Sequence, residues 1–576
     1  MPSCKQFLHR NHVKCCFSFP VLLAIVALFI YLGTAWLVLP PQAMWSPDEG
    51  AKLLQLQYLR FEGGHLVYAI PYIGRDIDPE MRFAQPDTAS GLLQIGEDAL
   101  YFRRLPVFPL LELPFFWLSG FRGLYLLPAI SGAACSILAL HLVEKRDRRP
   151  AMGIVIALGS PVFIYSTIFW EHTIATSLGI FSAWLILKIW PMHSSKWGQA
   201  LVWTVAGAML GISAYLRLEL ILFSISLLVA CWFVQPQFRQ GLIWSGIIML
   251  LILMPYIPLH MLMFNQPLPD NARYLFYPFL YLKQLKWRAV TDLLVGLGQD
   301  LAINLGWLGD LWAIASIVAV SHSLDPTKRA ARNLMLAGLG TTAVIGAIYL
   351  FTDDIYRSAH GLFFSTPWAL LGLCRAAEVW RRGDWRAKVI VLTILLGLTS
   401  HIACAAGFRS SGPHGGLEWG SRFALTFYPL LGLVAAWDLG SARDDAKTLL
   451  IAGALLFLGI GFQVRGVLTL QHDKQINAKL NQMLVEAPER YVVSDLWWIP
   501  FNAAPIYAQK AWCVTLTPTQ LREWIDLAAS HQVRQFVLVT LNNNLLNAIP
   551  TNGYVLHLIE EHQIEHLSIL RISITP

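Results

Sequence analysis

The chain has 576 residues, of which 56% are hydrophobic and only 14% are charged. A soluble protein of this length would carry about 25% charged residues, so the composition argues against an ordinary soluble enzyme. The net charge of +7 comes from short Lys and Arg clusters between apolar runs. Such clusters are typical of membrane topology, and we expect no nucleic-acid partner. Long apolar runs predict a polytopic α-helical membrane protein instead of a β-barrel.

The first apolar run covers residues 16–39 and is long enough to span a bilayer. A basic segment precedes it, which leaves two interpretations, a cleaved signal peptide or an uncleaved first helix. The run is long for a signal peptide, and no clear small-x-small site precedes Trp45. These features favour an uncleaved helix with its N-terminus inside.

Residues 40–123 have mixed polarity and are predicted to form a first long outside loop. Within it, Ser46-Pro47 is typical of a helix N-cap followed by proline in the first turn. The acidic pair Asp48-Glu49 would then lie at a helix N-terminus, where the helix dipole favours anions. Residues 105–118 are apolar but interrupted by three prolines. We expect them to form a helix at the outer interface, because a span here would put the basic residues 145–149 outside.

The remaining apolar runs bring the predicted number of transmembrane helices to about thirteen. After the first, they lie at about 124–143, 151–169, 173–190, 199–216, 219–234, 241–262, 301–320, 333–351, 360–376, 388–405, 421–437 and 447–463. A second long outside loop, 264–300, is basic and aromatic between Arg273 and Arg288. Residues 1–463 are therefore predicted to form the membrane domain.

Residues 464–576 are more polar, and the odd number of spans places them outside. Strands are predicted at 491–495, 513–516 and 535–540, and a capped amphipathic helix at 517–530. We therefore expect a small extracytoplasmic α/β domain at the C-terminus.

Short polar sequences occur where the predicted spans end on the outer side, which predicts one outward-facing polar site. Each of these polar sequences also has a purely structural interpretation. It could be a solvated helix start, a polar turn, an internal ion pair or an anchor for lipid phosphates. We find no metal-ligand spacing and no nucleotide-binding motif. The candidates are Asp48, Glu49, Glu171, His172, Arg217, Glu219, Arg357, His360, Trp419 and Arg422.

These motifs resemble the GT-C superfamily of integral-membrane glycosyltransferases, which includes protein O-mannosyltransferases and bacterial aminoarabinose transferases. The family places an Asp or Asp-Glu at the start of a long first outside loop that carries interface helices, as in Asp48-Glu49 and 105–118. Three further stretches resemble a poorly characterised bacterial branch. They are Phe169-Trp170-Glu171-His172-Thr173, Gly361–Pro367 and Gly415–Phe423, where Phe423 replaces the tyrosine expected in that branch.

The resemblance implies transfer of a sugar from a polyprenyl-phosphate or diphosphate carrier to an acceptor on the extracytoplasmic side, with inversion. Asp48 would be the general base, with Glu49 supporting or substituting for it. Glu171 and His172 would position the acceptor or the base. The leaving phosphate would be held by Arg217, Arg357 or Arg422. The substrate-binding set would also include Glu219, His360 and Trp419.

No cofactor is required by the sequence, although the superfamily allows a divalent metal. The expected partners are the lipid bilayer, a polyprenyl-phosphate-linked sugar donor and a lipid, glycan or protein acceptor. The expected location is a bacterial inner membrane, with the site and the C-terminal domain outside. A transporter or flippase for a lipid-linked glycan is the main alternative, and a scaffold with an outer binding domain is the third. A transporter would place charges at midmembrane depth, whereas the charges here lie at span ends.

Overall fold

The structure of the chain is a computed structural model. It describes residues 19–62, 65–67, 69–84, 93–96, 99–102, 104–142, 149–192, 195–264, 267, 302–324, 329–351, 361–405, 419–437, 446–542, 545 and 554–575.

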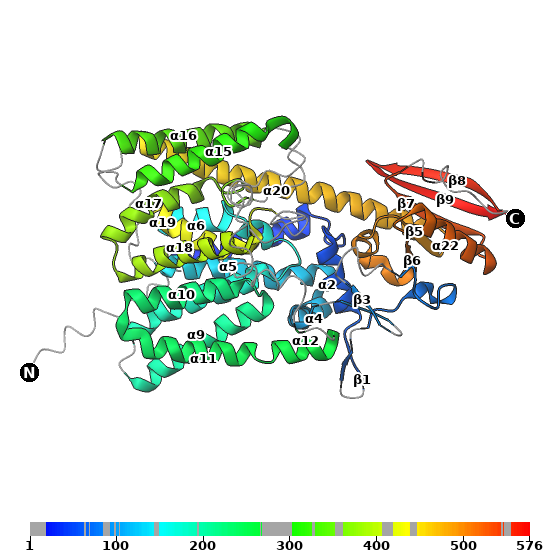
Figure 1. Ribbon diagram of the computed structural model, residues 1–576, viewed down its shortest axis with the longest axis horizontal. Helices are drawn as coiled ribbons and strands as arrows, with labels where there is room; N and C mark the ends of the chain where they lie inside the picture. Colours follow the sequence, from blue (N-terminus) through cyan, green and yellow to red (C-terminus); the bar gives the residue numbers. More distant parts are fainter. Residues whose placement is uncertain are drawn as a thin grey trace, which may run out of the picture.

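A bundle of apolar helices makes up most of the molecule, and a small domain with a β-sheet lies at one end of it (Figure 1). This arrangement confirms the predicted fold class, an α-helical polytopic membrane protein with a small C-terminal α/β domain. The bundle helices are α1 (Phe19–Gly33), α5 (Leu126–His141), α6 (Arg149–Leu158), α7 (Val162–Tyr165), α8 (His172–Trp184), α9 (Lys196–Leu216), α10 (Leu220–Val234), α11 (Arg239–Leu253), α12 (Tyr256–Phe264), α15 (Ala302–Ser323), α16 (Arg329–Leu350), α17 (Trp368–Arg382), α18 (Trp385–Ala405), α19 (Phe427–Ala435) and α20 (Ala446–Glu486).

Each of the thirteen predicted spans coincides with at least one helix, but the helices differ in length. Among the described residues, 8 helical stretches are long and apolar enough to cross a membrane. Two apolar helices, Leu220–Val234 and Leu308–Ser323, are shorter. The 10-residue α6 ends before Ser160-Pro161, and the 9-residue α19 is buried along its whole length. At these two predicted spans the helices are therefore shorter than hydropathy alone predicts.

The first loop folds against the end of the bundle. Helix α2 (Pro47–Gln57) begins as predicted, because the Ser46 side chain accepts a hydrogen bond from the Glu49 backbone N–H. Two small antiparallel hairpins follow, β1 (Arg60–Glu62) with β2 (His65–Val67) and β3 (Leu93–Ile95) with β4 (Leu100–Phe102). The proline-containing segment is a helix, α4 (Val107–Ser119), joined to α5 by the short helix η4 (Gly120–Tyr125).

Helix α20 links the bundle to the C-terminal domain. Its 41 residues run without interruption from the bundle to the sheet (Figure 1). At 1.5 Å per residue it is about 60 Å long, roughly twice the thickness of a hydrocarbon core. Residue 463, where the sequence suggests a domain boundary, lies inside this helix, so the two parts share one rigid element.

The C-terminal domain has a five-stranded sheet in the order β6-β5-β7-β9-β8. The predicted strands are β5 (Tyr491–Ser494), β6 (Ala511–Val514) and β7 (Gln535–Thr540), and the predicted helix is α22 (Pro518–Ser530), capped by Thr517. The hairpin β8 (Val555–Ile564) and β9 (Leu567–Thr575) was not predicted. Between β5 and β6 lie α21 (Ile499–Asn502) and η13 (Ala504–Gln509), which contact α2.

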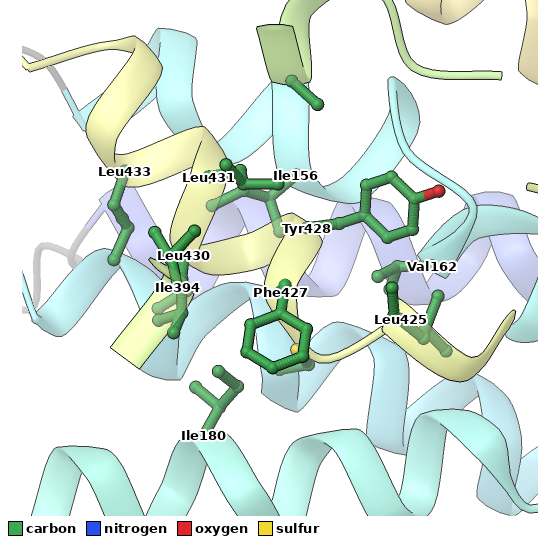
Figure 2. Packing of buried hydrophobic residues seen from close by; sticks show 14 of the residues in the cluster. Ile156, Val162, Ile180, Ile394, Leu425, Phe427, Tyr428, Leu430, Leu431 and Leu433 are labelled. Carbon is green, nitrogen blue, oxygen red and sulfur yellow. The ribbon is translucent and has the colours of Figure 1, made fainter. Parts of the chain in front are cut away.

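The core of the bundle surrounds α19. Figure 2 shows Phe427, Leu430 and Leu431 of α19 among Ile156 of α6 and Ile394 of α18. All nine residues of α19 are buried. Because a close-packed core resists displacement, the residues just before α19 are held in a fixed position.

Candidate active site

Helix α2 carries two charged side chains on the face that meets the bundle. Asp48 and Lys52 are four residues apart, so they lie on the same side of the helix. Lys52 is 3% exposed, whereas the Asp48 side chain is 17% exposed. Asp48 is therefore the more accessible of the two charged groups.

Glu171 is the centre of a buried ion cluster. Its Oε2 lies 2.7 Å from Lys52 Nζ, and its Oε1 lies 3.0 Å from Arg217 Nη1 and 3.9 Å from Arg104 Nη1. Burial favours the neutral carboxyl, but the nearby Lys52 and Arg217 charges outweigh it and hold the pKa of Glu171 well below its usual range. The carboxylate thus joins three cationic side chains from α2, the first loop and the turn between α9 and α10.

Arg217 lies in the turn between α9 and α10 and forms ion pairs with two acidic side chains. Besides Glu171, it contacts Glu219, with Nε 2.6 Å and Nη2 2.5 Å from Oε1. Both side chains are buried. The structure therefore contains the ion pair between Arg217 and Glu219, which the sequence left open as one interpretation. Glu171 extends this pair into a network.

Asp48 lies between two guanidinium groups. Its Oδ2 is 3.5 Å from Arg422 Nη1, and its Oδ1 is 4.0 Å from Arg104 Nη2. Burial acts to raise the pKa of Asp48, but Arg104, Arg422 and Lys52 together outweigh burial and the repulsion from Glu171, and the pKa lies below its ordinary value. Asp48 is therefore ionised at neutral pH.

Arg422 is placed by the short helix η12 (Arg422–Ala424) that precedes the buried α19. Gly420 has a φ of +65°, and a Cβ there would lie 2.5 Å from Pro161 and Ser365. Only glycine fits this turn, which explains the Trp-Gly-x-Arg pattern. The Arg422 guanidinium lies 5.3 Å from the ring of Trp170, a distance suited to a cation–π contact.

An aromatic stack lies under the charged groups. The His172 ring lies 5.1 Å from Tyr165 and 5.0 Å from Trp170. His172 is 3% exposed, and neither ring nitrogen has a hydrogen-bond partner among the described residues. The Trp419 backbone N–H donates to the Tyr165 hydroxyl at 3.2 Å, which ties Trp419 to the same stack.

Glu49 does not face the site. It is fully buried, and its two oxygens accept hydrogen bonds from the backbone N–H groups of Trp45 and Phe169, at 2.5 and 2.8 Å. Lys474 Nζ lies 3.7 Å from Oε1. With both oxygens occupied, Glu49 has no oxygen directed at a substrate. This environment favours an anchoring role over the supporting catalytic role expected from the sequence.

Two of the predicted site residues, Arg357 and His360, lie outside the described residues, as does the basic-aromatic stretch 273–288. The structure adds Lys52 and Arg104, which were not among the predicted candidates. Lys52 follows Asp48 at helical spacing, and that periodicity could have identified it. No local signal marks Arg104, because only the folding of the first loop brings it to Asp48.

A pocket opens beside the ion cluster. It encloses about 560 Å³ of empty space, including open solvent, and Asp48 lies just outside its wall, next to Arg104. Its lining combines charged groups of both signs with apolar and aromatic groups. The residues that line it are Lys52, Gln55, Phe102, Arg104, Leu105, Val107, Phe108, Pro109, Glu171, Tyr215, Leu216, Arg217, Leu218, Glu219 and Tyr256. A pocket of this kind suits an amphiphile with an anionic head.

A divalent cation does not fit the side chains found here. No group of three His, Cys, Asp or Glu in the described parts of the chain could hold a metal ion. Asp48, Glu171 and Glu219 each lie within 4.0 Å of an arginine or lysine. A metal bound to these carboxylates would have to displace those ion pairs.

A helical bundle with a small C-terminal α/β domain matches the GT-C membrane fold. ArnT from Cupriavidus metallidurans bound to undecaprenyl phosphate aligns with a TM-score of 0.51 and 12% identity, over 96% of this chain and 97% of that chain. Its apo state aligns with a TM-score of 0.50 over the same shares. The Archaeoglobus fulgidus oligosaccharyltransferase solved with Zn and sulfate aligns at 0.48 and 14% identity, over 90% of this chain and 67% of that chain.

No protein-family model and no curated protein sequence matches the chain. At 12% identity, the ArnT structures establish the fold and not the activity. The chain therefore has the GT-C fold, and its function has to be argued from its own site.

Proposed function

We propose that this chain is a membrane glycosyltransferase. It transfers a sugar from a polyprenyl-phosphate-linked donor to an acceptor hydroxyl on the extracytoplasmic side. The observation that carries the proposal is the ionised, partly exposed Asp48 between Arg104 and Arg422, beside a pocket with both charged and apolar lining. The GT-C fold supports it, and so does the undecaprenyl phosphate bound to ArnT of similar fold.

Asp48 acts as the general base in this proposal. The acceptor oxygen attacks the anomeric carbon while its proton passes to the Asp48 carboxylate. The bond from the anomeric carbon to the phosphate oxygen breaks, and its electron pair leaves with the polyprenyl phosphate. A single displacement of this kind inverts the anomeric centre. Since Asp48 is on the accessible side of α2, it can reach an acceptor that the buried Glu171 cannot.

Arg104 and Arg422 are the cations proposed to hold the departing phosphate. Their contacts with Asp48 are long, at 4.0 and 3.5 Å, whereas Arg217 is bound closely by Glu219 and Glu171. Arginine binds phosphate oxygens in a bidentate way and stabilises the charge that develops on them. Glu171 keeps Lys52 and Arg217 in place. The buried His172 packs in the aromatic stack with Tyr165 and Trp170.

The apolar part of the pocket is proposed to receive the first units of the carrier chain. Leu105, Val107 and Phe108 line it next to Arg104, so a phosphate at Arg104 would continue directly into an apolar environment. We place the site and the C-terminal domain outside a bacterial inner membrane, with a lipid, glycan or protein as acceptor.

Two measurements test this function. The protein is purified in mild detergent, and co-purified lipid is identified by native and lipid mass spectrometry, with undecaprenyl phosphate added as a probe. A panel of undecaprenyl-phosphate hexoses is then offered with envelope extracts as acceptor, and sugar transfer is followed by radiolabel. Bound polyprenyl phosphate together with transfer supports the proposal. Movement of an intact lipid-linked glycan across proteoliposomes, without transfer, would replace it with a flippase.

A further inference from the structure

We propose that the outer half of α20, together with α21 of the C-terminal domain, is a clamp that positions α2 and thereby Asp48. Lys474 is its central positioning residue. This inference rests on the proposed function, and it assigns a part in catalysis to a domain that lies beside the site without lining it.

The first part of the clamp is a buried ion pair. Lys474 and Glu49 are both 0% exposed, and Lys474 Nζ also donates to the Tyr125 hydroxyl at 3.0 Å. The Glu49 carboxylate joins α2 to the backbone of Phe169, two residues before Glu171. Because an isolated buried carboxylate is costly, the lysine from α20 is what allows Glu49 to make that link.

Neighbouring positions on α20 hold the residues before α2. Asp473 accepts a hydrogen bond from the Trp45 indole N–H at 3.0 Å, and the Asn477 side-chain amide donates to the Met44 carbonyl oxygen at 2.8 Å. From α21, the Asn502 amide donates to Asn477 Oδ1 at 3.3 Å. Together with Lys474, these residues form one face of α20 that contacts the segment before α2.

The second part of the clamp is a close backbone contact between Gly50 of α2 and Phe501 of α21. A Cβ built on Gly50 would lie 1.9 Å from the carbonyl oxygen of Phe501 in α21. Only a residue without a side chain allows α2 to approach the C-terminal domain so closely. The orange segment around residue 500 indeed adjoins the blue α2 in Figure 1.

The clamp is needed because the contacts of the Asp48 side chain are too long to fix its position. Its two ion pairs are 3.5 and 4.0 Å long, and the neighbouring Glu49 supplies the short, buried contacts. The position of Asp48 is therefore that of the α2 backbone. A displacement of about 1 Å at a reacting group reduces the rate on the order of 100-fold, so the clamp determines the rate of transfer.

Lys474→Met tests the ion pair. We expect kcat for transfer from an undecaprenyl-phosphate hexose to fall about 10- to 100-fold, with KM for the donor within about 3-fold of wild type, because the donor-binding cations are untouched. The matched control is Lys479→Met, an exposed lysine on the same helix.

Gly50→Ala tests the backbone contact independently, with Gly246→Ala as its control because a Cβ there meets nothing within 4 Å. The expected result is again a loss in kcat with an unchanged donor KM and unchanged binding of undecaprenyl phosphate in native mass spectrometry. Thermal unfolding identifies any variant that has lost its fold.

The outcomes separate the two proposals. If the wild type transfers sugar and both Lys474→Met and Gly50→Ala keep their kcat, the clamp is overturned and the glycosyltransferase stands. A fall in donor affinity with an unchanged kcat would also overturn the clamp. If the wild type transfers no sugar from any donor of the panel, the proposed function fails, and the assignment of the clamp to catalysis fails with it.

Discussion

Replacing Asp48 with asparagine is the sharpest test of the site. The substitution keeps the size of the side chain and removes its negative charge and its capacity to take a proton. If Asp48 is the general base, kcat should fall about 10²- to 10⁴-fold, which corresponds to about 3–5 kcal/mol in the barrier.

The structure predicts a much smaller effect on stability. Asp48 is partly exposed, and its ion pairs of 3.5 and 4.0 Å are longer than the pairs of Glu171 with Lys52 and Arg217, at 2.7 and 3.0 Å. A loose, partly solvated pair contributes about 0–1 kcal/mol. Asp48→Asn should therefore lower the free energy of unfolding by about 1–2 kcal/mol at most.

The assay measures transfer from the undecaprenyl-phosphate hexose that the wild type uses, alongside thermal unfolding in the same detergent. Glu62→Gln is the control, since Glu62 lies in the same loop with its side chain 57% exposed, paired with Arg60. A folded Asp48→Asn protein with kcat within about 3-fold of wild type would refute the assignment of the base.

Three further predictions follow from the same geometry. Glu171→Gln removes the close carboxylate partner of Lys52 and leaves Arg217 with Glu219 alone, so it should lower the free energy of unfolding by about 3–5 kcal/mol, measured by thermal unfolding. An unchanged midpoint would contradict the ion cluster. Arg104→Gln removes a charge that depresses the pKa of Asp48. If Asp48 is the base, it works only above its pKa, so the acidic limb of the kcat profile should move to higher pH. An unmoved limb would argue against this pairing. Ser530→Cys on α22 is exposed, whereas the five described cysteines are buried, so in a background with Cys4, Cys15 and Cys16 replaced by serine an impermeant maleimide should label it on intact cells; labelling only after permeabilisation would reverse the proposed topology.

The fold class could be predicted because a bilayer imposes strong rules on a sequence. Apolar runs must become helices in lipid, and every predicted span indeed coincides with one. The cap at Ser46 and the three parallel-type strands 491–495, 513–516 and 535–540 were equally accessible, because caps and short apolar strands have local signatures. The β8–β9 hairpin was missed because its outer strand is largely exposed and carries mixed charged and apolar residues without a clear alternation.

The sequence could predict which polar residues at the span ends form the candidate site. It could not predict how these residues contact one another. The sequence alone identified five of the candidates: Asp48, Glu171, Arg217, Glu219 and Arg422. The structure brings these side chains together in one network of ion pairs and close contacts. The sequence could not decide which of the adjacent residues Asp48 and Glu49 faces the site. In an acidic pair at a helix start the two side chains point about 100° apart, and which one meets solvent depends on what packs against the helix.

For this protein, the sequence by itself determined a helical membrane fold and the side chains available at one end of it, because hydropathy, charge bias and capping are local properties. Tertiary structure alone decided that Glu49 is buried against Lys474 while Asp48 stays accessible beside Arg422, and that Arg104 joins the site from the first loop. The physical reason is that these pairs connect residues far apart in the chain. Their energies depend on burial and distance, which exist only once α2, α20 and the segment before α19 have packed together.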